Sequence, residues 1–439
     1  MFRYYLKLGA LSIRANPALS ILMVLAIAVG IGACMTIVTV KHVMSDNPIA
    51  HKNDVLYHVQ VDNWSPAEPY QDPDKPPEQM TYLDAKALYD AGKAFRQVTS
   101  YKTSRVVQPE GEGARPFQLE ARATTADFFP MFDVPFLYGS PWDRASDDAE
   151  ERVTVLSQEL NEQLFGGEDS TGRMLTINGE EYRVSGVLDE WTPVPKFYDL
   201  NNNPYEAPEA LYLPFSLAAT NGFSRSGNTS CWKPVADGGF EEFLASECIW
   251  IQMWIELRDA SEKEGYLQFL DAYAEEQKAL GRFQRPLNNR LNTPSEWLAD
   301  QEVVDDNVNV LLSIAVLFLL VCLLNTIGLL LAKIMRRAKD ISLRRALGAS
   351  KRTLFVQYII EAGMIGTAGG LLGVGATWLG LRGIENLWSD YDFIQYLVRM
   401  DWSMVLLAVV LAVFSALAAA MYPTWRACNI TPASQLRLQ

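Results

Sequence analysis

The residues best suited to chemistry in this sequence are the basic side chains between Leu329 and Gln357. This stretch separates two long apolar segments and holds a single acidic residue, Asp340. Because the whole chain has a formal charge of -14, such a positive patch needs a specific reason. A basic loop between two membrane spans is typical of the cytoplasmic side, and we expect a partner to act on it there. The eight basic residues are Lys333, Arg336, Arg337, Lys339, Arg344, Arg345, Lys351 and Arg352.

Common catalytic and metal-binding motifs are missing from the sequence. The only Gly-Lys pair, Gly92-Lys93, lacks the upstream glycine of a phosphate-binding loop, and HExxH, CxxC and G-x-S-x-G are absent. The three histidines, His42, His51 and His58, do not have the helical spacing of a metal pair. We therefore predict no catalytic site, no metal site and no directly bound cofactor. The many acids of the central region are interpreted as a solvated surface.

Two polar residues stand inside apolar segments, Asn325 and Glu361. Polar groups in lipid are costly and usually face protein or water. We favour pairing of Glu361 with arginines of the basic loop, and a proton-relay role is the alternative.

Four apolar runs must position these residues. A helix needs about 20 apolar residues to cross a bilayer, and the sequence predicts one span before and three spans after a large central domain. The fold class is therefore an α-helical membrane protein with a large α+β domain between its first and second spans. The runs are Leu19–Val40, Val308–Leu331, Tyr358–Leu381 and Trp402–Tyr422.

Charge divides the chain in the same way as hydropathy. Residues 44–306 hold 46 acids and 22 bases, whereas the remainder holds 6 acids and 16 bases. The acidic domain is thus unsuited to binding nucleic acid. The bases Arg3, Lys7 and Arg14 predict a cytoplasmic N-terminus on an amphipathic segment, and four spans return the C-terminus to the same side. The domain is then extracytoplasmic.

The central domain shows two β-α-β patterns around a mostly β insertion. Strand, helix and strand are predicted at 55–61, 81–91 and 94–107, and again at 249–257, 261–280 and 283–291. Between these two patterns, short strands are predicted at 117–124, 153–156, 174–177 and 182–188. Asn178-Gly179 is predicted to join the last two strands as a type I′ hairpin turn. The sequence predicts two lobes, the second inserted into the first.

The return to the membrane begins at Thr293-Pro294-Ser295-Glu296, which fits a helix capping box with proline at the first position. Neither proline nor glycine occurs again before Gly328. The sequence therefore predicts one continuous helix of about 40 residues, about 60 Å long, that serves as stalk and second span.

Two further patterns concern packing and crosslinks. Cys231 and Cys248 are the cysteines of the outer domain, and we predict a disulfide between them, with two buried free thiols as the alternative. In the third span, small-xxx-small pairs allow close helix approach in lipid. They either pack within the bundle or form an interface that slides during a working cycle. These pairs are formed by Gly366, Gly369, Gly370 and Gly373.

The chain resembles the MacB/FtsX-type, or type VII, permeases of ABC transporters. The resemblance extends in the right order along the whole chain and is most specific in the basic loop. It is carried by Asn16-Pro17 with 28–33, by 325–348 with the run 340–350, by Tyr422-Pro423-Thr424-Trp425-Arg426-Ala427 with Thr431-Pro432-Ala433, and by head segments 126–129, 153–157, 164–166 and 184–187.

Such permeases, the resemblance implies, lie in the bacterial inner membrane and dimerise as homo- or heterodimers. Cytoplasmic ABC ATPase subunits, which bind ATP and Mg, drive the periplasmic domain through stalk helices, a mechanism called mechanotransmission. Only about fifteen residues precede the first span here, so the ATPase is expected to be a separate chain. A periplasmic adaptor, an outer-membrane duct and membrane lipids are the further partners expected.

The resemblance places the ATPase-coupling helix at about Asp340 to Arg352. Leu343, Ala346 and Leu347 would share one face that is open to a groove on the ATPase, and Gly348 would end the helix. The alternatives are that the charge serves only topology and that the apolar face docks on the protein's own bundle. The predicted coupling residues are Asp340, Ile341, Leu343, Arg344, Arg345, Leu347, Gly348 and Ser350.

Two functions remain open at this stage. The first is a permease subunit, itself not an enzyme, that exports a peptide, drug-like or lipidic molecule from the periplasm. The second is an FtsX-like regulator of an outside partner such as a cell-wall hydrolase. The expected organisation is 1–17 cytoplasmic amphipathic segment, 18–43 first span and stalk, 44–293 periplasmic domain (porter-like 50–112 and 249–293, sabre-like 113–248), 294–335 stalk and second span, 336–357 cytoplasmic coupling loop, 358–381 third span, 382–401 periplasmic loop, 402–422 fourth span and 423–439 cytoplasmic tail.

Overall fold

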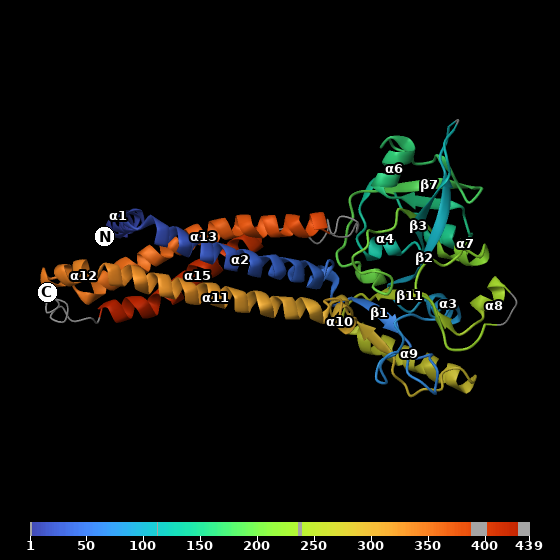
Figure 1. The fold of residues 1–439 in the computed structure, drawn as a ribbon. Coiled ribbons are helices and arrows are strands. Elements are labelled where there is room, and N and C mark those ends of the chain that lie inside the picture. The colour runs from blue at the N-terminus through green and yellow to red at the C-terminus, as the bar shows by residue number, and fades with distance from the viewer. Residues whose placement is uncertain (1, 112, 236–238, 388–401, 429–439) are drawn as a thin grey trace. The chain divides into compact units, whose positions relative to one another are not determined.

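The computed structural model describes residues 2–111, 113–235, 239–387 and 402–428 (Figure 1). They form two compact units. The bundle comprises residues 1–45 and 304–439, and the head comprises residues 46–303. The expected loop at 382–401 and tail at 423–439 fall largely outside the described residues.

In its described residues, the bundle is built from helices and contains no strand. Within the described part, four helices are long and apolar enough to cross a membrane: α2, α11, α13 and α15. With the head inserted between α2 and α11, the prediction of one span followed by three is confirmed. The helices are α1 (Phe2–Ala15), α2 (Pro17–Ser45), α11 (Asp306–Arg336), α12 (Ala338–Ala346), α13 (Lys351–Leu387) and α15 (Trp402–Cys428).

Small and branched apolar side chains make the core of the bundle. Helix α13 packs against both α15 and α2, and α11 packs against α2. On α15 the core-facing positions recur every fourth residue, which is the spacing of one helix face. The series starts at Met404, and its next four positions are alanine, which lets α13 approach closely: Ala408, Ala412, Ala416 and Ala420.

The head is built on one sheet of ten strands. Nine of them follow the order β12-β1-β11-β2-β3-β8-β5-β7-β4, and β6 pairs with β2 and β7. Two more strands, β9 (Ser230–Cys231) and β10 (Cys248–Ile249), form a separate pair. The ten are β1 (Leu56–Gln60), β2 (Arg96–Gln108), β3 (Phe117–Thr124), β4 (Phe136–Gly139), β5 (Val153–Leu156), β6 (Met174–Ile177), β7 (Glu180–Leu188), β8 (Leu211–Pro214), β11 (Gln252–Glu256) and β12 (Arg290–Asn292).

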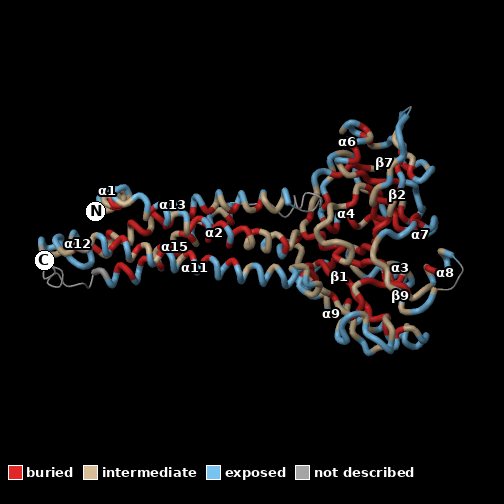
Figure 2. The backbone as a smooth tube through the Cα atoms, in the orientation of Figure 1, coloured by how far each residue is buried: buried red, intermediate tan, exposed pale blue. Residues whose placement is uncertain are grey.

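Short helices cover this sheet, and both faces are largely buried (Figure 2). Along the chain, α3 follows β1 and precedes β2, and α9 follows β11 and precedes β12, which is the strand-helix-strand order that the sequence predicts. The helices of the head are α3 (Tyr82–Asp90), α4 (Phe128–Met131), α5 (Arg144–Asp148), α6 (Gln158–Phe165), α7 (Phe215–Thr220), α8 (Phe240–Leu244), α9 (Glu262–Ala279) and α10 (Pro294–Asp300), with 3-10 turns η1 (Ala50–Lys52) and η2 (Phe197–Asp199).

The two lobes share strand β2 rather than forming separate sheets. The first residues of β2 pair with β11 of the first lobe, and the residues from Ser100 onward pair with β3 of the second. Through β2, the strands of the inserted lobe continue the sheet of the first lobe. The predicted hairpin between β6 and β7 is present, with Asn178 and Gly179 at φ 50° and 85°, the left-handed values that a type I′ turn requires.

The prediction of one continuous stalk helix is wrong. The capping box at Thr293 and Glu296 is present, but α10 ends at Asp300 and α11 starts only at Asp306. Between them Glu302 takes a left-handed φ of 46°, and the Asp305 side chain accepts from the backbone N–H of Asn307. Acids disfavour the C-terminal end of α10 and favour the N-terminal end of α11, so the same acidic run ends one helix and starts the next.

Candidate coupling site

The basic loop folds into a short helix that is closed by glycine. After α12, Gly348 adopts φ 100° and donates its N–H to the Arg345 carbonyl at 3.1 Å. Ala349 then donates to the Arg344 carbonyl at 3.0 Å, which satisfies the last carbonyls of the helix. Ser350 begins the next element, because its Oγ accepts from the Thr353 N–H at 3.1 Å.

The expected helix from Asp340 to Arg352 is therefore two elements. Lys351 and Arg352 belong to the first turn of α13, and only the part before Gly348 forms α12. A left-handed glycine followed by a serine cap separates them. Within α12 the charges suit the helix dipole, with Asp340 in the first turn and Arg344 in the last.

Apolar residues of the loop point in two directions. Ile341 is 7% exposed and packs with Ile334 of α11 and Leu354 of α13. Leu343 and Leu347 are 61% and 80% exposed, one helical turn apart. One apolar contact thus fixes α12 on the bundle, while a second apolar pair is left open. The side chain of Ala346 lies outside what the structure describes.

The basic side chains of the loop differ in what they contact. Arg344 donates from Nη1 to Gln357 Oε1 of α13 at 3.3 Å, so it also braces the loop. Arg336 and Arg352 are exposed. Arg344 and Arg345 directly follow Leu343 in the sequence, so positive charge adjoins the open apolar pair.

Beneath the loop, Glu361 of α13 is 2% exposed and pairs with Lys333 of α11, with 2.5 Å between Oε1 and Nζ. The prediction paired Glu361 with arginines of the loop. Arg337 reaches it only through Ser12 of α1, which donates to Glu361 Oε1 at 2.7 Å and accepts from Arg337. Sequence reasoning missed Lys333 and Ser12, because only the packing of α1 and α11 on α13 brings them to Glu361.

Asn325 of α11 is exposed on this chain, unlike Glu361. Leu324 beside it is 65% exposed, and a Cβ at Gly328 would meet no atom within 4 Å. An amide in an apolar, otherwise uncovered helix face is costly in lipid and is suited to a contact with another helix.

The four glycines of the small-xxx-small pairs in α13 face other helices of the same chain. A Cβ at Gly366 or Gly370 would come within 2.6 Å or 2.9 Å of an alanine of α15. A Cβ at Gly369 or Gly373 would come within 2.7 Å or 2.9 Å of an isoleucine of α2. The two overlapping pairs therefore serve two neighbours of α13, one on each side.

In the head, a disulfide joins Cys231 and Cys248, which are directly opposite each other on β9 and β10. It closes the segment that contains α8. Arg225 lies over the ring of Phe243 in α8, 3.4 Å from the ring centroid, and adds a cation–π contact.

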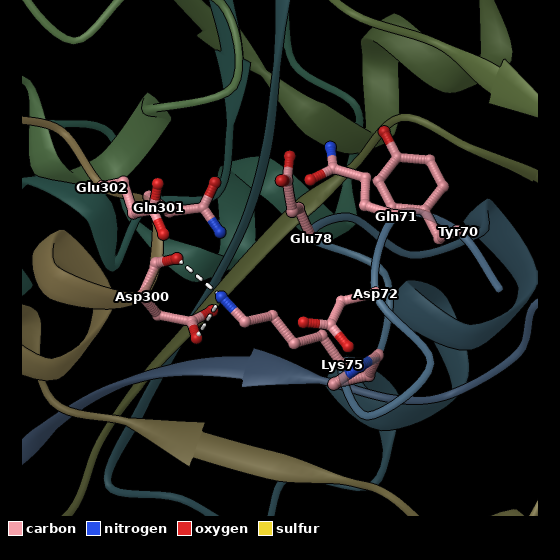
Figure 3. A pocket seen from close by; sticks show the side chains of 9 residues that line it. Tyr70, Gln71, Asp72, Lys75, Glu78, Asp300, Gln301 and Glu302 are labelled. Atoms are coloured by element: carbon pink, nitrogen blue, oxygen red, sulfur yellow. Dashed lines mark hydrogen bonds and ion pairs between the residues drawn. The ribbon is translucent and has the colours of Figure 1, made fainter. Parts of the chain in front are cut away.

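A cavity of about 260 Å³ lies in the head beside the end of α10 (Figure 3). Lys75 crosses it and binds the carbonyl and the carboxylate of Asp300, each at 3.0 Å. Burial raises the pKa of Glu78, although amide donors such as Asn201 oppose the rise. Lys75 thus ties the loop between β1 and α3 to the last residue of α10. Its lining is Tyr70, Gln71, Asp72, Lys75, Pro76, Glu78, Asp300, Gln301 and Glu302.

Two family models match the sequence. The MacB-like periplasmic core domain matches residues 20–264, which is more than half of the chain. The FtsX-like permease C-terminal domain matches residues 312–432, which include α12 and the glycine-rich α13. The two matches follow each other along the chain without overlap.

Known proteins similar to the chain include an uncharacterized ABC transporter permease, YknZ, of Bacillus subtilis (strain 168), 22% identical over 99% of this chain and 98% of that protein. The macrolide export ATP-binding/permease protein MacB of Rhodospirillum rubrum is 24% identical over 84% of this chain and 51% of that protein. Among solved structures, the periplasmic region of MacB from Actinobacillus actinomycetemcomitans matches with 13% identity and a TM-score of 0.35, covering 57% of this chain and 94% of that one.

Proposed function

Because the chain belongs to the MacB/FtsX-type family of ABC transporter permeases, we propose that it converts ATP hydrolysis by a separate cytoplasmic ATPase into motion of its head. In this proposal the bundle lies in a bacterial inner membrane with both termini cytoplasmic, and the head is periplasmic. The chain itself catalyses nothing, and ATP and Mg bind to the ATPase. The work is export, from the periplasm, of a peptide, drug-like or lipidic molecule with the help of an adaptor and an outer-membrane duct.

The observation that carries this proposal is the exposed pair Leu343 and Leu347 on a helix that is otherwise held in place. An apolar pair of this kind, bordered by arginines, fits an apolar groove with acids at its rim. Ile341 on the opposite side keeps α12 on the bundle, so force applied to the open pair would reach α11 and α13.

In this proposal, force enters the head through α10, which packs into the head core. Trp297 of α10 is 1% exposed and stacks on His58 of β1, with 3.8 Å between ring centroids. Burial lowers the pKa of His58 to about 3, so the ring is neutral and packs as an aromatic. In the proposal, movement of α11 passes through residues 301–305 to a helix that is embedded in the head core.

A second permease, identical or different, would cover the open face of α11. The exposed amide of Asn325 beside the unhindered Gly328 supports this part of the proposal, since both features favour close helix contact in lipid. Lipid would cover the remaining apolar surface of the spans.

The test is copurification of the full-length chain with an ABC ATPase from membranes, followed by ATP hydrolysis assays. We expect Leu343→Asp with Leu347→Asp to reduce ATPase recruitment at least about 30-fold, as loss of a central apolar contact does. Leu280→Asp is the matched control, because Leu280 is 70% exposed but lies in the head. Recovery of a cell-wall hydrolase in place of an adaptor would favour the regulatory alternative. Unchanged recruitment by the double variant would refute the docking role.

A further inference from the structure

A buried ion pair joins four helices of the bundle near the loop that contains α12. Lys333 of α11 is 3% exposed and Glu361 of α13 is 2% exposed. Lys333 Nζ also donates to Ser20 Oγ of α2 at 2.9 Å. Ser12 of α1 donates to Glu361 Oε1 at 2.7 Å. One lysine and one carboxylate thus connect α1, α2, α11 and α13.

Helix α1 is attached at this point by more than one contact. Arg337 donates to the Ser12 hydroxyl and, from Nη2, to the Ser12 carbonyl at 3.1 Å. A Cβ at Gly9 would lie 2.8 Å from Met364 Sδ and 3.7 Å from Glu361 Cα, so α1 lies directly on α13. The amphipathic N-terminal helix is therefore part of the charge cluster.

The cluster lies one helical turn before the open loop. Arg337 lies between the last residue of α11 and the first residue of α12, and Lys333 precedes it by one turn. Lys333 contacts Glu361 directly, and Arg337 is linked to Glu361 through the Ser12 hydroxyl. Any displacement of the start of α12 along α13 would stretch this link. The apolar contact of Ile341 and the hydrogen bond from Arg344 to Gln357 also hold the loop on the bundle.

The pair is poorly built for stability alone. Glu361 Oε2 is buried and has no hydrogen-bond partner among the described residues. Removing two charges from water is costly, and apolar replacement of a buried pair is often neutral or stabilising. A pair of this kind is more effective at fixing one arrangement, because sliding α11 past α13 by one turn of about 5.4 Å would separate the charges in a medium of low dielectric.

We propose that Lys333 and Glu361 are a positioning pair, which fixes α12 in register with α13 and makes α1 part of the path from the ATPase to the head. The proposal rests on the function proposed above. In it, force on Leu343 and Leu347 moves α11, α13 and α1 together, because the charge cluster prevents α12 from sliding over the bundle.

The test compares single variants with a double variant in the complex of the full-length chain and its copurified ATPase in lipid nanodiscs. Lys333→Met and Glu361→Leu alone each leave one buried charge without its partner, and we expect them to lower thermal stability. Combined, they leave no charge, and we expect thermal stability and ATPase recruitment like those of the wild type. In the double variant, we expect the nucleotide-dependent change in hydrogen exchange of residues 294–300 to be at least about tenfold smaller than in the wild type. Misplacement of a functional group has effects of this size.

A merely structural pair gives a different result. In that case the double variant would restore the nucleotide-dependent exchange together with stability, and this outcome overturns the proposal. If wild-type protein recruits no ATPase, the proposed function fails instead, which separates the two failures.

Ser12→Ala keeps the test decisive if the double variant does not fold, since it removes one hydroxyl and leaves both charges paired. We expect it to weaken the nucleotide-dependent exchange while recruitment stays unchanged. Ser313→Ala is the matched control, because Ser313 Oγ bonds only the Asn309 carbonyl of its own helix at 2.9 Å. Equal behaviour of the two variants would overturn the role of α1.

Discussion

The head and the bundle both bury charge, but they do so in different ways. In the head, Arg122 donates to Asp199 and, at 2.7 Å, to Glu209 Oε1, and all three side chains are at most 1% exposed. Lys196 adds a second cation at 3.2 Å from Glu209. Among the described residues of the bundle, Lys333 and Glu361 form a buried pair in which one carboxylate oxygen is left open.

The head network is saturated on its acidic side. Gln252 and Asn202 donate to Asp199, and Tyr198 donates to Glu209 Oε2 at 3.2 Å. Although burial alone would raise the pKa of Glu209, Arg122 and Lys196 together hold it well below its ordinary value. The segment from Lys196 to Glu209 is thereby fixed to β3 and β11. A network in which every carboxylate oxygen has a partner suits a rigid body, whereas a pair with an open carboxylate oxygen suits a boundary between elements that carry force.

The comparison is tested most strongly at Arg122. We expect Arg122→Met to lower the free energy of unfolding by about 3–5 kcal/mol, because two buried carboxylates lose their shared cation. Arg152→Met is the control, since its pair with Glu180 is about half exposed and is expected to contribute less than about 1 kcal/mol. Thermal unfolding of the full-length chain in detergent measures both. Equal losses would mean that the head does not depend on its network.

Neither charge cluster could be predicted from the sequence alone. Arg122 follows Glu120 and Gln118 on one face of its strand, and such alternation normally marks a solvated face. Only the cover on both sides of the sheet buries it. Likewise, Lys333 looks like one more base of the loop until α1 and α13 are placed beside it.

Local signals were more reliable than long-range ones. Hydropathy located the four spans, Asn178-Gly179 located a hairpin, and Thr293 with Glu296 located the start of α10. The continuous stalk failed because the absence of proline and glycine between Pro294 and Gly328 does not guarantee a helix. Acids at 300–306 stop α10 and cap α11, which is a balance of charge and capping that a search for helix breakers does not detect.

A second test concerns a carboxylate of the head that has neutral donors. Asp147 accepts from the Ala126 N–H at 2.6 Å and from Trp142 Nε1 at 2.9 Å, and burial raises its pKa to about 7. The folded state therefore holds this proton more tightly than the unfolded state. Its stabilising contribution is complete below about pH 4 and is lost as the pH rises through 7, by about 2–4 kcal/mol.

We expect Asp147→Asn to flatten this dependence in unfolding measurements between pH 4 and pH 8. The variant loses one acceptor, so it is less stable than the wild type at pH 4 and gains relative to it at pH 8. Asp148→Asn is the control, because Asp148 is exposed. If both variants keep the wild-type slope, Asp147 is not the titrating group.

The smallest expected effect concerns how the bundle is fixed away from its ion pair. A Cβ at Gly366 would lie 2.6 Å from Ala416 Cβ and 3.1 Å from the Ala412 carbonyl oxygen, so α15 would have to shift. We expect Gly366→Ala to destabilise the bundle by about 1–3 kcal/mol in thermal unfolding.

Gly375→Ala on the same helix is the matched control, since no atom lies within 4 Å of the added Cβ. It should be neutral or stabilise by up to about 1 kcal/mol, because alanine favours a helix more than glycine does. Opposite signs for the two variants would mean that α13 and α15 hold one fixed contact through their small residues. The register of the bundle would then have two sources, glycine packing at mid-helix and the Lys333–Glu361 pair beneath α12. If Gly366→Ala is neutral, the interface between α13 and α15 tolerates a shift, and glycine packing at mid-helix does not set the register of the bundle.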